Sequence, residues 1–461
     1  GLLLLRLRDR GSEVNAWAVS GAKIAGSVIL LALVLWGVSK LAKIAKLDPE
    51  VGRKLVHISL GLYTLTFPFV FVAAWEVWAT CILAVGVFLL ARGSMRESLG
   101  GGLHAVKRVS YGELLFAASV ALLFWLKDGH FISSAQGKHH VGPVLYVLPI
   151  LILTLCDAAS AVVGSRYGKR VFRIEEGSKS VEGVVVFAVT AWLISLIVIL
   201  LLAPQVGRGE AVLLAFITAV FGALLEAASW RGLDNLFIPL GLYFLLANLL
   251  PFGVTELALI AGAFFIVLIA LLKLTAGSGA NRHVMAAGAT LFFCIWTFSG
   301  PYSLITPAAA VAAYFLCVRV LKIERPEHDA LNLLLVVLAV ALAFFLASHL
   351  FRMDTIYGFN AAFAALTAGI AARFSANWIV VSGVALLALL AMSVRTLWMA
   401  GVREETLMFS LIGAGGIVLA VIFGASQRER QVQRPWITLG GLSALIGLVS
   451  LIGTPARVVT P

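Results

Sequence analysis

The feature that most constrains this chain is a long series of apolar runs, each close to the length that crosses a lipid bilayer. A membrane-spanning helix needs about 20 apolar residues, because the hydrocarbon core is ~30 Å thick. Charged residues and Gly/Pro clusters delimit about sixteen such runs, at 20–38, 55–72, 74–91, 112–126, 143–163, 182–203, 211–229, 237–250, 255–273, 284–298, 303–318, 330–350, 358–372, 378–394, 406–424 and 436–453. We therefore predict an all-α, polytopic transmembrane helical bundle. The short runs 112–126, 237–250, 284–298 and 358–372 also fit re-entrant or half helices.

Composition supports the membrane interpretation. Hydrophobic residues make up 61% of the chain and charged residues 13%, whereas a typical soluble domain carries about 25% charged residues. The net charge of +12 does not indicate a nucleic-acid partner, because the basic residues lie in short loops and form no basic tail. They indicate contact with phospholipid headgroups of the bilayer instead. The four cysteines form no C-x-x-C pair, which argues against a disulfide framework or a zinc site. The sequence sets no oligomeric state.

Lysine and arginine are unevenly shared between alternate loops. One side of the predicted topology holds 24 of the 35 basic residues and the other side 11. The positive-inside rule makes the richer side cytoplasmic and places both termini outside, although Arg6, Arg8 and Arg10 lie against the rule. The opening Leu2–Leu5 run is too short for the core of a signal peptide, which needs about 7–15 apolar residues.

Polar residues within the spans concentrate between residues 50 and 240, and after residue 276 the spans are almost purely apolar with charges in the loops. We therefore predict two membrane domains, 1–275 and 276–461, with the boundary in Thr275–Asn281.

A basic segment opens the second run. In Arg53-Lys54-Leu55-Val56-His57, Arg53 and His57 are four residues apart and share a helix face, with Lys54 beside them. Three potential cations at the predicted cytoplasmic mouth of a span suit a phosphate-rich ligand. The alternative is a basic cap whose side chains extend to the membrane surface.

A carboxylate lies inside an otherwise apolar span. Asp157 begins the segment D-A-A-S-A-V-V-G-S-R-Y-G-K-R (157–170), and an unpaired charge in a membrane span is costly, so Asp157 is a functional candidate. Gly164 lies on the same helix face and allows a ligand or a second helix to approach closely. A helix-packing seam with a buried hydrogen bond is the alternative.

Two further segments carry polar groups. We expect G-S-K-S-V-E-G (177–183) to form a turn whose backbone N–H groups face an anion at a helix start. Lys179 adds a charge there, and Ser180 is a helix cap or a phosphate ligand. Glu226, Asp234 and Asn235 are candidate oxygen ligands for Mg²⁺, although Asp234-Asn235 also suits a simple turn. All four segments are predicted at the cytoplasmic face, where carboxylates and cations match a Mg²⁺–triphosphate.

The segments 53–62, 157–170, 177–183 and 224–239 resemble, in this order, the motifs of the CTP-dependent lipid-alcohol kinases: phytol kinase, dolichol kinase and the fungal type of diacylglycerol kinase. The resemblance covers roughly residues 50–240, with the phytol kinase branch most similar. It implies transfer of the γ-phosphate of CTP to a membrane isoprenoid alcohol, by a prenol kinase-like domain at 1–275; the role of 276–461 stays open.

In this scheme Asp157 and Asp234 hold Mg²⁺ with Glu226 as a third candidate, while Lys179, Arg53 and Lys54 neutralise phosphates. Either His57 or Glu182 orients the attacking hydroxyl or accepts its proton. The candidate CTP-binding residues are Arg53, Lys54, Gly164, Gly168, Lys169, Ser180, Gly183 and Asn235.

Two alternative functions remain at this stage. The first is a cytidylyltransferase acting on a lipid phosphate, although the K-D…H-G-G ending of phosphatidate cytidylyltransferases is missing from this sequence. The second is a lipid transporter or flippase, which would more often place charges at the bilayer midplane.

Overall fold

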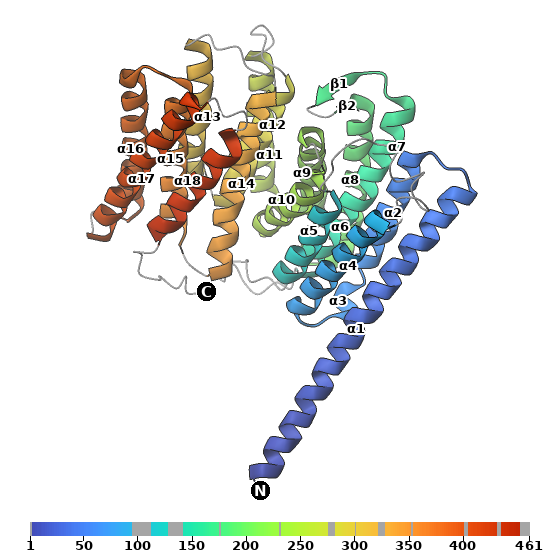
Figure 1. The fold of residues 1–461 in the computed structure, drawn as a ribbon. Coiled ribbons are helices and arrows are strands. Elements are labelled where there is room, and N and C mark those ends of the chain that lie inside the picture. The colour runs from blue at the N-terminus through green and yellow to red at the C-terminus, as the bar shows by residue number, and fades with distance from the viewer. Residues whose placement is uncertain are drawn as a thin grey trace. The chain divides into compact units, whose positions relative to one another are not determined.

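The computed structural model describes residues 2–94, 112–127, 142–174, 177–229, 232–274, 282–299, 301–320, 328–351, 354–400, 404–430 and 435–451. The chain divides into two compact units, Gly1–Ala263 and Phe264–Pro461 (Figure 1). The division falls inside one helix, α11. The predicted boundary segment Thr275–Asn281 lies outside the described residues.

In the part of the first unit that the structure describes, the elements are helices and one short hairpin. Its elements are α1 (Leu2–Ile44), α2 (Pro49–Thr64), α3 (Phe67–Val70), α4 (Ala74–Ser94), α5 (Gly112–Leu126), α6 (Gly142–Leu151), the π-helical turn η2 (Ile152–Cys156), α7 (Asp157–Tyr167), β1 (Val171–Ile174), β2 (Gly177–Ser180), α8 (Val181–Leu202), α9 (Arg208–Ala228), α10 (Asp234–Leu249) and α11 (Val254–Leu274), which continues into the second unit. The strands pair antiparallel, with Val171 opposite Ser180.

In its described residues the second unit consists of helices joined by short connections. Beyond the end of α11 it contains α12 (Arg282–Ser299), the 3₁₀ turn η3 (Pro301–Leu304), α13 (Ile305–Val320), α14 (His328–Phe351), α15 (Ile356–Phe374), α16 (Trp378–Ala400), α17 (Glu404–Glu429) and α18 (Pro435–Leu451).

The predicted fold class is confirmed, because each predicted apolar run coincides with a helix or a succession of helices in the described residues. Among the described residues, six helical stretches are long and apolar enough to cross a membrane, and eight more apolar helices are shorter. The protein is an all-α polytopic transmembrane bundle. Three runs are subdivided: 55–72 forms α2 and α3, 143–163 forms α6, η2 and α7, and 303–318 forms the end of η3 and α13.

A π-helical turn interrupts the span that carries Asp157. Pro149 lies inside α6 and has no N–H to donate to the preceding turn, so regular α-helical bonding is already broken there. The π turn Ile152–Cys156 follows and ends directly before Asp157. Such turns are frequent at functional sites, because they change the direction in which the next side chains point.

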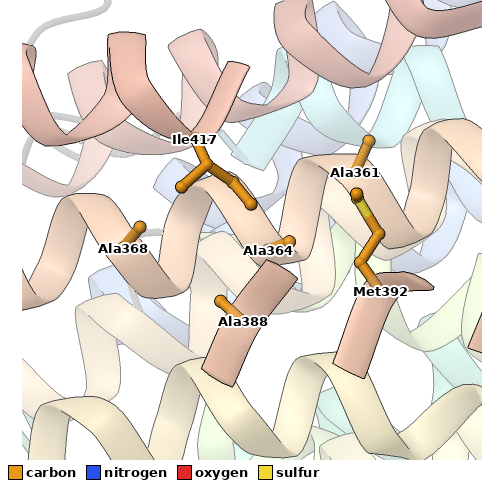
Figure 2. Packing of buried hydrophobic residues seen from close by; sticks show 6 residues of the cluster. All are labelled: Ala361, Ala364, Ala368, Ala388, Met392 and Ile417. Carbon is orange, nitrogen blue, oxygen red and sulfur yellow. The ribbon is translucent and has the colours of Figure 1, made fainter. Parts of the chain in front are cut away.

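The core of the second unit is built around α15, which is buried on all sides from Gly358 to Phe374. Its alanines let neighbouring helices approach closely, as small residues do in membrane bundles. Figure 2 shows Ile417 of α17 and Met392 of α16 directed at this helix, in a buried cluster with Ala361, Ala364, Ala368 and Ala388.

One expectation for the second unit is wrong. Its charges are not confined to loops, because Arg373 lies in α15 and Arg395 in α16, with 8% and 6% of their surface exposed. Both were read as loop residues because each stands directly at the end of an apolar run.

Candidate active site

Three carboxylates from three different helices converge in the first unit. Asp157, Glu226 and Asp234 each offer an oxygen, and these oxygens lie within 4.8 Å of one another. Asp157 and Glu226 are buried, with 5% and 6% of their surface exposed. Three carboxylates at this separation repel one another unless cations lie among them, so the site requires compensating positive charge.

The helix ends determine where these side chains meet. Asp157 is the first residue of α7, directly after the π turn, and Glu226 lies in the last turn of α9. The connection to α10 passes through Gly232, whose φ of 81° is a left-handed conformation that glycine adopts without strain. Asp234 then begins α10, so this one connection brings its carboxylate back toward Glu226.

Two residues of α2 contact Asp157. Lys54 Nζ donates to Asp157 Oδ2 at 2.5 Å, and both side chains are buried. His57 Nε2 lies 3.8 Å from the same oxygen and 3.4 Å from the carbonyl oxygen of Leu153 in the π turn. Lys54 therefore compensates the buried carboxylate, as the cost of an intramembrane charge requires, and His57 is held beside it.

Lys179 compensates the second buried carboxylate. Its Nζ donates to Glu226 Oε1 at 2.7 Å and also to the backbone carbonyl oxygen of Glu226. That carbonyl lies at the C-terminal end of α9, where a cation is favoured by the helix dipole. Lys179 thus joins strand β2 to the end of α9.

Several buried oxygens in this cluster lack a hydrogen-bond partner: Glu226 Oε2, Asp234 Oδ1 and Asn235 Oδ1. Buried polar atoms are nearly always satisfied in folded proteins. Carboxylate and amide oxygens are also the ligands that Mg²⁺ prefers. The donor set therefore fits a divalent cation that completes the bonding of these atoms.

Glu182 does not belong to this carboxylate group. Its oxygens accept hydrogen bonds from the backbone N–H groups of Lys169 and Arg170, at 3.1–3.2 Å. Glu182 therefore fastens the loop after α7 to the start of α8. Glu182 and Lys169 are 13 residues apart, and the spacing of residues in the sequence does not predict a hydrogen bond between them.

The expected turn at 177–183 is instead strand β2 followed by the first turn of α8. Ser180 is the N-cap of α8, and its Oγ accepts from the Gly183 N–H at 3.1 Å. Of its two predicted roles, helix cap or phosphate ligand, the structure therefore displays the cap. The strand was missed because its Gly and Ser residues have low β propensity.

The glycines of the site permit close packing between α7 and α8. A Cβ on Gly168 would lie 2.6 Å from Ser180 Cβ, and one on Gly164 would lie 2.9 Å from Ser180 Oγ. A Cβ on Gly183 would lie 3.0 Å from the carbonyl oxygen of Ser160. A larger residue at any of these positions would push the hairpin and α8 away from α7. Small residues allow such close approach between helices in membrane bundles.

The remaining predicted residues differ in exposure. Arg53 is exposed at the start of α2, Lys169 is exposed after α7, and Asn235 is partly buried next to Asp234. The Nδ2 group of Asn235 donates to the Gly232 carbonyl oxygen at 3.3 Å.

Sequence reasoning missed two contributors to this geometry. Gly61 packs so closely on Thr154 that a Cβ would lie 2.1 Å from its Oγ1, which sets α2 against the π turn. Gly232 supplies the left-handed residue between α9 and α10. The dipeptide Arg-Gly before Leu-Asp-Asn was the available signal for the second, because glycine punctuates a turn.

Comparison with known proteins places this site in context. The model of the cytidylyltransferase family matches residues 14–234, which include the carboxylate cluster. Phytol kinase of Synechocystis sp. (strain ATCC 27184 / PCC 6803 / Kazusa) is 31% identical over 229 residues, an alignment that covers 49% of this chain and 88% of that protein. No solved structure matches the chain.

The helical fold and these comparisons together indicate a membrane-embedded transferase of a CTP-dependent family. The chain belongs to the CTP-dependent lipid-alcohol kinase family, through its N-terminal half. Residues beyond 263 belong to the second unit, outside the residues that the family model matches.

Proposed function

We propose that this protein transfers the γ-phosphate of CTP to a membrane isoprenoid alcohol such as phytol, geranylgeraniol or a polyprenol. The observation that carries the proposal is the cluster of Asp157, Glu226 and Asp234, which is flanked by Lys54 and Lys179. Phosphoryl transfer depends mainly on positioning and charge neutralisation, and carboxylates beside lysines provide both. The 31% identity to a phytol kinase supports the choice of an isoprenoid alcohol.

In the proposed reaction the alcohol oxygen forms a bond to the γ-phosphorus, the bond from that phosphorus to the β,γ-bridging oxygen breaks, and CDP leaves. Asp157, Glu226 and Asp234 would hold Mg²⁺, which neutralises phosphate charge when it is bound. Lys179 lies on β2, paired with Glu226, and would contact the phosphates, together with exposed Arg53 and Lys169.

His57 and Glu182 are the two candidates for the residue that orients the attacking hydroxyl and accepts its proton, and we propose His57. Its Nε2 lies 3.8 Å from Asp157 Oδ2 and 3.4 Å from the Leu153 carbonyl oxygen, so the neutral ring carries its proton on Nε2. The other ring nitrogen, Nδ1, would then accept the proton of the alcohol as phosphate transfers. Glu182 instead keeps the loop at Lys169 and Arg170 in place, because its oxygens already accept from those backbone N–H groups.

Cytidylyl transfer to a lipid phosphate is the second candidate, because the matching family model is that of the cytidylyltransferases. The same carboxylates and lysines would then serve attack at the α-phosphorus. The two reactions differ in the phosphorus that enters the lipid.

One labelling experiment tests the reaction and the membrane face together. Sealed vesicles of each orientation are incubated with a prenol, Mg²⁺ and CTP labelled at the γ or the α position. We expect lipid label from the γ position alone, and only in vesicles whose cytoplasmic face is outward. Label from the α position would show cytidylyl transfer, and no label in lipid from either position would refute both. Equal labelling in both orientations would contradict the cytoplasmic placement.

We also propose that catalysis resides in residues 1–275, since the site described above lies wholly in the first unit. A chain ending near Gly277 retains all of α11. It should insert, remain monodisperse and phosphorylate a prenol at no less than a tenth of the full-length rate. If a well-folded truncation binds CTP but transfers phosphate only when residues 278–461 are supplied separately, the second unit completes the active site and this assignment is wrong.

A further inference from the structure

An apolar cavity lies beside the carboxylate cluster, between α1, α2, α4 and α5 of the first unit. Its walls are mostly aliphatic and aromatic. Representative lining residues are Leu31, Leu60, Phe67, Ala84, Phe88 and Val120.

The polar groups of this cavity gather at one end. Arg53 and His57 lie near the start of α2, and Glu113 lies at the start of α5. The opposite end is formed by Thr64 and Phe67. From Arg53 to Thr64 the helical rise amounts to about 16 Å, roughly half the thickness of the hydrocarbon core. The cavity is therefore long, with one polar end.

The threonine hydroxyls at the far end, those of Thr64 and Thr80, already donate hydrogen bonds to backbone carbonyl oxygens nearby in the chain. Thr64 Oγ1 donates to the Gly61 carbonyl oxygen and Thr80 Oγ1 donates to the Glu76 carbonyl oxygen, each at 2.8 Å. A ligand there meets methyl groups and rings, so the far end is chemically apolar. Charged phosphates or a nucleotide base would lose hydration in this region without compensation, whereas a hydrocarbon chain would gain from burial.

His57 joins this cavity to the carboxylate cluster. It lines the polar end, and its Nε2 lies 3.8 Å from Asp157 Oδ2. Asn235 lines the same end, follows Asp234 in the chain, and has a buried Oδ1 without a hydrogen-bond partner. A molecule whose chain fills the cavity thus places its head group where the phosphate would be transferred.

We propose that this cavity binds the chain of a single-chain isoprenoid alcohol, with the hydroxyl between His57 and Asn235. This inference deepens the proposed function and rests on it for the identity of the hydroxyl as the phosphate acceptor. The hydroxyl gives its proton to His57, and its oxygen lies beside Asn235, which lines the same end of the cavity. A diacyl lipid fits less well, because the cavity offers one apolar length with one polar end, and the second chain would have to lie outside it.

Photolabelling tests the site without relying on turnover. A prenol with a diazirine at its tail end is added to the purified full-length protein in the absence of CTP. We expect adducts at far-end residues such as Leu31, Cys81 and Val120, removed by a tenfold excess of unlabelled phytol. Adducts confined to other helices would overturn the proposal. So would equal labelling of these residues by a tail-diazirine phosphatidylcholine that phytol does not displace, because that pattern identifies a bilayer-lipid site.

A pair of neighbouring substitutions tests the same site by kinetics. Ala117 lines the cavity, and Ala118, the next residue of α5, does not; both are partly buried. Ala117→Phe should raise the KM for the alcohol at least tenfold and leave the KM for CTP unchanged, whereas Ala118→Phe should change neither. Equal effects of both, or an unchanged alcohol KM in a folded Ala117→Phe, would overturn the proposal. If the wild-type protein shows the expected labelling pattern but no kinase activity, the proposed function is refuted and the binding site is not.

Discussion

Asp157→Asn should reduce phosphate transfer at least a thousandfold, which corresponds to about 4 kcal/mol of transition-state stabilisation. Asparagine keeps the shape of the side chain and one acceptor oxygen but removes the charge. It therefore removes one proposed metal ligand and the partner of Lys54. Turnover with CTP and a prenol measures the effect. A variant that keeps more than about a tenth of wild-type activity, a loss below ~1.4 kcal/mol, would show that Asp157 serves packing alone.

Asp157→Asn also affects stability, because it leaves a buried lysine without its counter-charge. In Asp157→Asn the buried Lys54 ammonium, with 6% of its side chain exposed, loses its counter-charge, and breaking a buried pair on one side costs about 3–5 kcal/mol of stability. The double variant Lys54→Met with Asp157→Asn removes both charges. We expect its thermal unfolding temperature to return toward wild type while its activity stays abolished. Recovery of activity along with stability would contradict a direct role for Asp157.

Asp234→Asn should separate metal binding from folding. The structure gives Asp234 Oδ1 no hydrogen-bond partner, and the side chain lies near two other carboxylates. Removing its charge relieves like-charge repulsion, so without divalent cations the variant should unfold at a temperature no lower than wild type. It should also lose most of the stabilisation that Mg²⁺ confers on the wild type. Its half-maximal Mg²⁺ concentration for turnover should rise at least tenfold.

A carboxylate outside the cluster provides the matched control. Asp354 is exposed in the second unit and accepts from the Ile356 N–H at 3.0 Å, a bond that asparagine also makes. Asp354→Asn should leave both the Mg²⁺ titration and the unfolding temperature unchanged. If Asp234→Asn behaves like Asp354→Asn in the Mg²⁺ titration, the three carboxylates do not hold the metal.

The sequence predicted the fold class because a bilayer imposes a simple rule. Every backbone polar group in the hydrocarbon core must be bonded within the protein, which leaves a helix of about 20 apolar residues as the local solution. That rule acts on consecutive residues, so the helices could be located from the order of residue types. The same physics singled out Asp157 and Glu226, because carboxylates in apolar spans are costly and need a reason to be there.

Only the tertiary structure decided which residues are partners. Lys54 and Asp157 are 103 positions apart, and Lys179 and Glu226 are 47 apart. Nothing in their local sequence distinguishes these pairings from others with Arg53 or Asp234. The choice depends on close helix approach, such as that of Gly61 to Thr154, and on the turn at Gly232. Packing also assigned Glu182 to the loop and opened the cavity beside His57, because contacts between distant helices are determined by the shapes of whole surfaces and by no single segment.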